Sequence, residues 1–147
     1  MQKGSEMMEY DELKLEFTAS ASNEAFARSA AAAFVAKADP EADEAVDIRT
    51  AVSEAVTNCI VHAYGKEKGK IYMTVRILPH REIDVHIRDK GCGIDDIEKA
   101  MTPLYTSAPE SERAGLGFAV MESFMDSLRV RSTPGKGTTV IMKKKLR

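Results

Sequence analysis

A stripe of apolar residues runs through the segment from Glu41 to Ala63, where such residues recur at intervals of three and four. That spacing is typical of an amphipathic helix, because 3.6 residues complete one turn. A helix of this length must bury its apolar stripe against another element, so the chain requires at least two layers of secondary structure. The stripe consists of Ala45, Ile48, Val52, Ala55, Val56, Cys59, Ile60 and Ala63.

Short segments on either side of this helix alternate apolar and polar residues, which is the pattern of half-buried strands. Strands are expected at about 13–18, 71–77, 83–87, 128–132 and 138–143. A helix at about 22–38, with Ser22 and Asn23 as its N-cap, precedes the long helix, and a third helix is expected from Leu116 to Leu128. This order predicts an α+β fold: a two-layer α/β sandwich whose mixed, mainly antiparallel sheet carries three helices on one face.

The composition fits a single domain and argues against several other classes of protein. The 147 residues include 21 basic and 23 acidic side chains, a net charge of −2 that does not favour a dedicated nucleic-acid binder. The longest apolar run, 30–36, is too short to span a membrane. Cys59 and Cys92 lack the spacing of a metal site, and the N-terminus lacks a signal core, so we expect a reduced, cytoplasmic setting. Residues 1–12 are expected to form a flexible extension, and residues 13–147 the domain.

A polar stripe opposite the apolar one suggests metal chemistry on the long helix. Glu54 and Asn58 are four residues apart and therefore project from the same face, in line with His62. A carboxylate beside a carboxamide oxygen suits a hard cation such as Mg²⁺. The alternative from this pair alone is an ordinary solvated helix face.

Two glycine-containing turns are candidates for ligand contact. Asp89 is followed by Gly91 and Gly93, which allow a ligand to approach the backbone closely beside a fixed acceptor, although such a turn is often only structural. Gly115 and Gly117 introduce the third helix, whose free N–H groups attract phosphate. The irregular segment at about 95–117 is expected to be a lid that carries Arg113. No segment fits the P-loop template.

Taken together and in this order, the motifs resemble a known family. Glu54 with Asn58, Asp89 with Gly91 and Gly93, Gly115 with Gly117, and residues 137–139 look like the N, G1, G2 and G3 boxes of the Bergerat-type ATPase fold. That fold is shared by gyrase, Hsp90, histidine kinases and MutL. Residues 24–40, 51–64, 103–126 and 135–140 resemble the anti-sigma-F factors of endospore-forming bacilli, and the likeness extends from about Leu15 to Lys143.

This resemblance implies a homodimeric ATP-dependent serine kinase that uses Mg²⁺, binds ATP or ADP and does not act at a membrane. It implies two protein partners: a sporulation sigma factor that is sequestered, and an anti-anti-sigma protein that is phosphorylated on a serine. Ala108 and Ala63 stand where relatives often carry lysine and glycine, and Lys90 and Cys92 occupy the variable places of the aspartate-glycine turn; none of these is a box residue. The alternatives are the anti-sigma kinase of the general stress response, a nucleotide-dependent binding module without phosphotransfer, and a detached histidine-kinase catalytic domain.

The resemblance also implies a role for each candidate residue. Glu54 would orient or deprotonate the incoming serine hydroxyl, and Arg113 would reach the γ-phosphate. Arg28 would belong to the surface that docks the partners, although it could equally be a core-flanking side chain that reaches water. ATP would be bound by a set of polar and glycine residues: Asn58, which would also ligate Mg²⁺; Asp89, which would accept from the adenine amino group; and Gly91, Gly93, Gly115, Gly117 and Thr138.

Overall fold

The computed structural model describes residues 10–65, 68–94, 96–101 and 116–147. In chain order, its main elements are β1 (Asp11–Thr18), α2 (Ala21–Val35), α3 (Ala42–Asn58), β2 (Lys70–Leu78), β3 (Glu82–Asp89), α4 (Ile97–Ala100), α5 (Leu116–Phe124), β4 (Ser127–Thr133) and β5 (Gly137–Lys145). Short 3₁₀ turns occupy Ala36–Ala38 and Pro79–Arg81, and a π-helical turn occupies Cys59–Tyr64. Among the described helices, none is long and apolar enough to cross a membrane.

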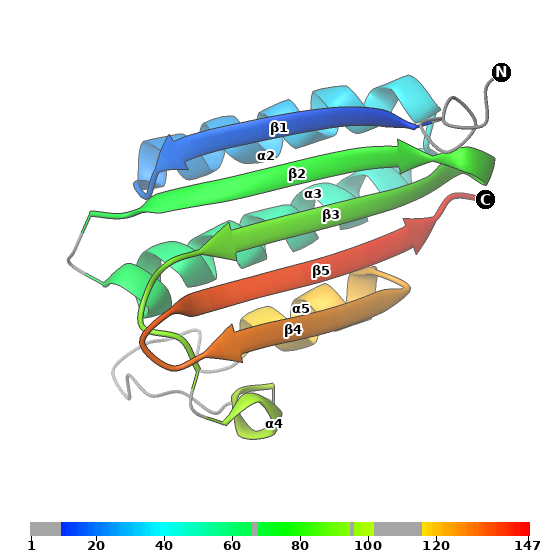
Figure 1. Cartoon of the computed structure of the whole chain (residues 1–147). Helices are drawn as coiled ribbons and strands as arrows, with labels where there is room; N and C mark the ends of the chain where they lie inside the picture. Colours follow the sequence, from blue (N-terminus) through cyan, green and yellow to red (C-terminus); the bar gives the residue numbers. More distant parts are fainter. Residues whose placement is uncertain (1–9, 66–67, 95, 102–115) are drawn as a thin grey trace, which may run out of the picture.

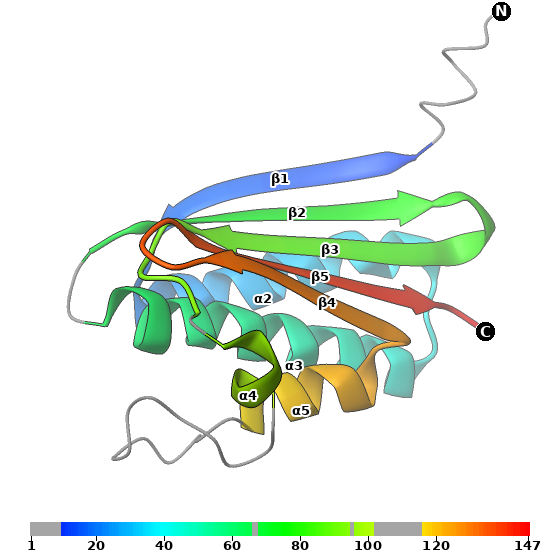
Figure 2. The same ribbon diagram turned by 60° about the horizontal axis from the view of Figure 1, so that its bottom comes forward.

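The strands form one sheet in the order β1-β2-β3-β5-β4, and each described ladder is antiparallel. Helices α2, α3 and α5 lie together on one face of this sheet, and none of the described helices covers the other face (Figures 1 and 2). The predicted α+β two-layer sandwich is therefore confirmed. Its sheet is antiparallel wherever it is described, because hairpins join β2 to β3 and β4 to β5 and no helix crosses over between parallel neighbours.

The core lies between the sheet and α3. Alternate residues of the central strands point toward the helices and are almost completely buried: Ile71, Met73, Val75, Ile83, Val85 and Ile87. They meet the stripe of α3, where Ile48, Val52 and Val56 are buried to the same degree. Each of these side chains contributes about 1.5–3 kcal/mol through removal from water. On the opposite, largely polar face, Asp84 is buried beside Arg76 and His86.

The ends of the helices differ from the predictions in three places. The N-cap of α2 is Ser20, whose hydroxyl accepts the backbone N–H of Asn23 at 3.2 Å, and not Ser22 or Asn23. The long helix is α-helical only to Asn58, after which the chain widens into the π-helical turn and stops at Gly65 with φ of +60°. Helix α5 ends at Phe124, so Leu128 belongs to β4.

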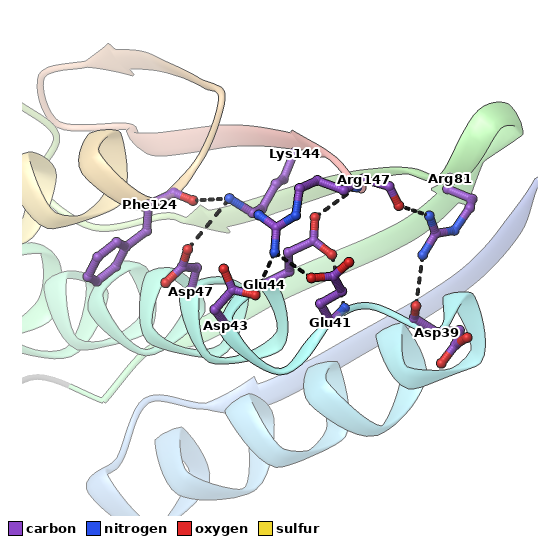
Figure 3. A network of polar contacts seen from close by, with 9 residues as sticks. All are labelled: Asp39, Glu41, Asp43, Glu44, Asp47, Arg81, Phe124, Lys144 and Arg147. Carbon is purple, nitrogen blue, oxygen red and sulfur yellow. Dashed lines mark hydrogen bonds and ion pairs between the residues drawn. The ribbon is translucent and has the colours of Figure 1, made fainter.

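A polar network at one end of the sandwich ties the last residues of the chain to the start of α3 (Figure 3). The carboxylate of Glu44 is 1% exposed and accepts the backbone N–H groups of Glu41 and Arg147 at 3.0 and 2.8 Å. Lys144 on β5 donates to the carbonyl of Phe124 at 2.8 Å and lies 3.7 Å from Asp47. These contacts fix the N-terminal half of α3 relative to the sheet.

Candidate functional site

The N-terminus of α5 packs directly against the polar end of α3. A Cβ atom added to Gly117 would lie 2.9 Å from Oδ1 and 3.1 Å from Nδ2 of Asn58, so the carboxamide would have to shift. Glycine therefore lets the backbone of α5 approach this carboxamide without displacing it. The structure thus brings together the predicted magnesium ligand and one of the two predicted phosphate-binding glycines.

Asp89 ends β3 as a buried acceptor, 5% exposed, that is held by backbone donors. Its Oδ1 atom accepts the N–H of Gly91 at 2.9 Å and that of Thr138 at 3.2 Å. The thiol of Cys59 lies near this carboxylate and, as a donor, opposes the rise in pKa that burial causes there. Backbone donors from the following turn and from β5 therefore fix the orientation of one side chain, as expected for an acceptor that recognises a ligand.

Close backbone packing connects the predicted glycine turns around Asp89. Gly137 has φ of +124°, and a Cβ atom there would lie 2.2 Å from the carbonyl oxygen of Asp89. Gly93 has φ of +78°, and a Cβ atom there would lie 2.3 Å from the carbonyl oxygen of Thr133. A larger residue would force the hairpin of β4 and β5 away from the end of β3 at Gly137, and away from the turn after β3 at Gly93.

Ser132 organises this region, and the sequence analysis did not identify it. Its hydroxyl accepts the N–H of Ile94 at 2.7 Å, donates to the carbonyl of Gly137 at 3.0 Å and lies 2.8 Å from the hydroxyl of Thr138. Ser132 and Thr138 are cross-strand partners in the β4–β5 hairpin. The only signal in the sequence for this hydrogen-bonding role is a pair of hydroxyl residues, Ser132 and Thr138, on either side of the turn between β4 and β5.

Burial dominates the electrostatics of the site. Removal from water raises the pKa of Asp89, and the hydrogen bonds from Gly91, Cys59 and Thr138 oppose that rise. Burial, followed by the negative charge of Asp89, raises the pKa of the Cys59 thiol well above its usual range. Cys59 therefore stays a neutral S–H donor, and the sequence analysis had counted it only as part of the apolar stripe. Burial lowers the pKa of half-buried His62, which favours a neutral imidazole there.

The remaining candidates fall into two groups. Glu54 is half-buried on α3, one turn before Asn58, as predicted from their spacing. Arg28 on α2 donates twice to Glu24, at 2.9 and 3.0 Å, and Glu24 in turn accepts the hydroxyl of Ser53 on α3 at 2.8 Å. The Arg28 side chain is 34% exposed and is thus held in place rather than free in solvent. Arg113, Gly115 and most of the expected lid lie outside the described residues.

The donor set fits a nucleotide better than a metal held by the protein alone. Among the described residues, no group of three or more His, Cys, Asp or Glu side chains converges as a metal site does. Magnesium commonly uses few protein ligands, with phosphate oxygens and water completing its shell. Asn58, against the start of α5, is placed for that limited role, while Asp89 offers a buried acceptor for a ring amino group.

Comparison with known proteins identifies the class of this site. Residues 17–144 match the family of histidine kinase-like ATPase domains. The solved structure of a Mycobacterium tuberculosis protein with RsbU and RsbW domains matches 92% of this chain with a TM-score of 0.68 and 19% identity, and this chain spans 32% of that longer chain. A blue-light activated histidine kinase domain from Erythrobacter litoralis matches 71% with a TM-score of 0.53. Fold and site together thus define a histidine kinase-like ATPase domain, a nucleotide-binding class.

Sequence relatives narrow this class further. An anti-sigma F factor from Pasteuria penetrans is 52% identical over 95% of this chain and 93% of its own length. One from Caldanaerobacter subterraneus is 54% identical over 93% of this chain and 96% of its own length. The chain belongs to the anti-sigma F factor family, which confirms the resemblance seen in the sequence.

Proposed function

We propose that this chain is an anti-sigma factor that sequesters the sporulation sigma factor F and phosphorylates a serine of the corresponding anti-anti-sigma protein. Membership of the anti-sigma F factor family supports the first part, and the histidine kinase-like ATPase domain supports the kinase activity. The observation that carries the nucleotide chemistry is the buried Asp89 carboxylate, which two backbone N–H groups orient.

Each residue of the site has a role in this proposal. Asp89 accepts a hydrogen bond from the exocyclic amino group of adenine, while Gly91, Gly93 and Thr138 keep its turn in place. Asn58 offers its carboxamide oxygen to Mg²⁺, at the point where Gly117 lets the start of α5 approach. When bound, Mg·ATP supplies the phosphoryl group that is transferred.

Phosphoryl transfer needs mainly alignment and charge stabilisation from the protein. Glu54, one turn before Asn58, orients the serine hydroxyl of the substrate and accepts its proton. Arg113 and Gly115 belong to a lid at about 95–117, where the arginine neutralises charge at the γ-phosphate; such an arginine contributes about 10³ to 10⁵ in rate. The domain that carries these residues was expected to comprise 13–147; because β1 already begins at Asp11, we propose that the domain includes Asp11 and Glu12 and follows a shorter N-terminal extension.

Partner binding is proposed to involve Arg28 and a second copy of the chain. The ion pair with Glu24 presents the Arg28 guanidinium in a fixed position on α2. The sheet face that no described helix covers would permit a homodimer (Figure 2). Charge reversal by Arg28→Glu is expected to weaken binding of both protein partners, and normal binding of both would remove Arg28 from the docking surface.

The decisive experiment measures transfer of labelled γ-phosphate from Mg·ATP to the purified anti-anti-sigma protein. Wild type is expected to label one serine, whereas Glu54→Gln binds ATP without transfer. If wild type binds ATP but labels nothing, the chain acts as a nucleotide-dependent binding module. If it labels only the stress-response counterpart, the assignment of the partner is wrong.

A further inference from the structure

A pocket with a volume of about 520 Å³ lies at the other side of the turn that carries Asp89. Residues before and within the start of β2, residues 90–92 and Gly135 of the β4–β5 turn form its walls. Asp89 itself does not line it. Asp89 lies on the helix-facing side of β3 with buried Ile87, whereas Tyr72 of the pocket pairs with Arg88 on the other face of the sheet, so the pocket and the Asp89 carboxylate are on different sides.

The charge of this pocket is entirely positive among the described residues that line it. Lys68, Lys70 and Lys90 contribute to its walls, and no Asp or Glu does. All three lysines are exposed, and within the described part of the chain their ammonium groups form no ion pair. Arg76 on the same strand as Lys70, by contrast, pairs with Glu12 at 2.6 Å. The pocket thus gathers three lysines without a described acidic partner, although the net charge of the chain is −2.

Aromatic residues hold the pocket in shape. The guanidinium of Arg88 lies 4.5 Å and the ammonium of Lys90 5.0 Å from the centre of the Tyr72 ring. These cation–π contacts keep both cations at the rim of the pocket. The hydroxyl of Tyr64 donates to the carbonyl of Lys70 at 2.5 Å and accepts the backbone N–H of Lys90 at 2.7 Å. Tyr64 therefore ties the two backbone walls together, so the backbone positions of Lys70 and Lys90 are fixed before a ligand arrives.

We propose that this lysine pocket, formed by Lys68, Lys70 and Lys90 around Tyr64 and Tyr72, docks an acidic segment of a protein partner. The three ammonium groups stand on exposed, flexible stems, which suits several carboxylates along an extended chain better than one small, enclosed anion. Electrostatic contacts of this kind guide association and weaken as salt rises. Lys68 and Lys70 are two residues apart, which matches carboxylates on alternate residues of an extended partner segment.

The test uses the full chain and a fluorescent peptide of six glutamates, with a peptide of six glutamines as its neutral counterpart. This peptide contains no serine, so its binding does not depend on the proposed kinase activity. The double variant Lys68→Glu, Lys70→Glu reverses two pocket charges without touching the nucleotide site. Its matched control is Arg129→Glu, Arg131→Glu, which reverses two exposed charges at the same spacing on β4.

Fluorescence anisotropy is expected to show salt-dependent binding of the glutamate peptide, with affinity reduced about tenfold or more by the lysine variant and by less than about twofold in the arginine control. Thermal melting of both variants checks that the fold is retained. Equal weakening by both variants would mean that only net charge matters and would overturn the proposal. Displacement of the peptide by an equal concentration of inorganic phosphate would also overturn it, because the pocket would then select a small anion.

Discussion

Replacement of Gly117 by alanine separates the stability of the fold from the geometry of the nucleotide site. The new Cβ atom would lie 2.9 Å from Oδ1 of Asn58. Carbon and oxygen atoms in ordinary contact are further apart, so the carboxamide must move by about 0.5 Å. Because the Asn58 amide is at the end of a rotatable side chain, we expect this shift to cost about 1 kcal/mol, the low end for overpacking.

A second effect acts in the opposite direction. Alanine in place of glycine within a helix stabilises by at most about 0.5–1 kcal/mol, so the net change in the free energy of unfolding should be close to zero. Affinity for Mg·ATP should fall much more, by about tenfold to a hundredfold, because a displaced ligand no longer meets its target. Chemical denaturation and titration with a fluorescent ATP analogue measure the two quantities on the same protein.

A double-mutant cycle isolates the contact itself. In an Asn58→Ala background the obstructing carboxamide is absent, so Gly117→Ala should show its full stabilisation there. The difference between the two backgrounds is expected to be about 1 kcal/mol, within the range found for residues in contact. Identical effects of Gly117→Ala in both backgrounds, or unchanged Mg·ATP affinity in the single variant, would refute the reasoning.

Three further substitutions test the buried carboxylates. Burial raises the pKa of Asp89 in the folded state, so the charged carboxylate opposes folding once the pH exceeds that pKa. Asp89→Asn should therefore raise the melting temperature of the free protein at pH 7 while abolishing ATP binding. A lower melting temperature would contradict this. Cys59→Ala removes a donor to the Asp89 carboxylate, so ATP affinity should fall about threefold to tenfold, and the loss of ATP affinity at acid pH should begin at a higher pH. Cys59→Ser retains a donor and serves as the control. Superimposable pH profiles of ATP affinity for wild type and both variants would exclude the role of the thiol. Hydrogen bonds from the backbones of Arg147 and Glu41 lower the pKa of Glu44, so the stabilisation that this carboxylate gives the fold is present above its unfolded-state pKa and is lost as the pH falls. Glu44→Gln should therefore lower the melting temperature at pH 7 and much less at pH 3. An equal loss at both pH values would argue against this role of Glu44.

The periodicity of the sequence was sufficient to predict the layers of this fold. Alternation in residues 71–77 and 83–87 identified the central strands, and the three- and four-residue spacing identified α3. The predictions failed where several residues could play the same local role. Ser20, Ser22 and Asn23 can all cap a helix, and only the direction from which β1 enters α2 selects Ser20. The change to a π-helical turn after Asn58 likewise has no signature in the apolar pattern.

The candidate site was predictable to the extent that its residues lie in compact motifs. Asp89, Gly91 and Gly93 form one turn, so their association follows from the sequence alone. Cys59 and Ser132 could not be assigned in this way, because their roles depend on partners far along the chain. A cysteine in an apolar stripe is ordinarily a core residue, and nothing local indicates that its thiol meets a carboxylate 30 residues later, at Asp89.

Helix α3 links two regions with opposite effects on stability. Its 17 residues span about 25 Å. At one end, the network around Glu44 and Arg147 fixes the helix to β5 and is stabilising at neutral pH (Figure 3). At the other, Asn58 and Cys59 face a site whose buried charge is unfavourable for folding. Because the apolar stripe between these ends is packed along the sheet, α3 keeps its position in the folded protein when the contacts at one end are lost. We therefore expect loss of the distant network to lower stability while the nucleotide affinity of the folded protein is retained, which is the inverse of the effect expected for Asp89→Asn.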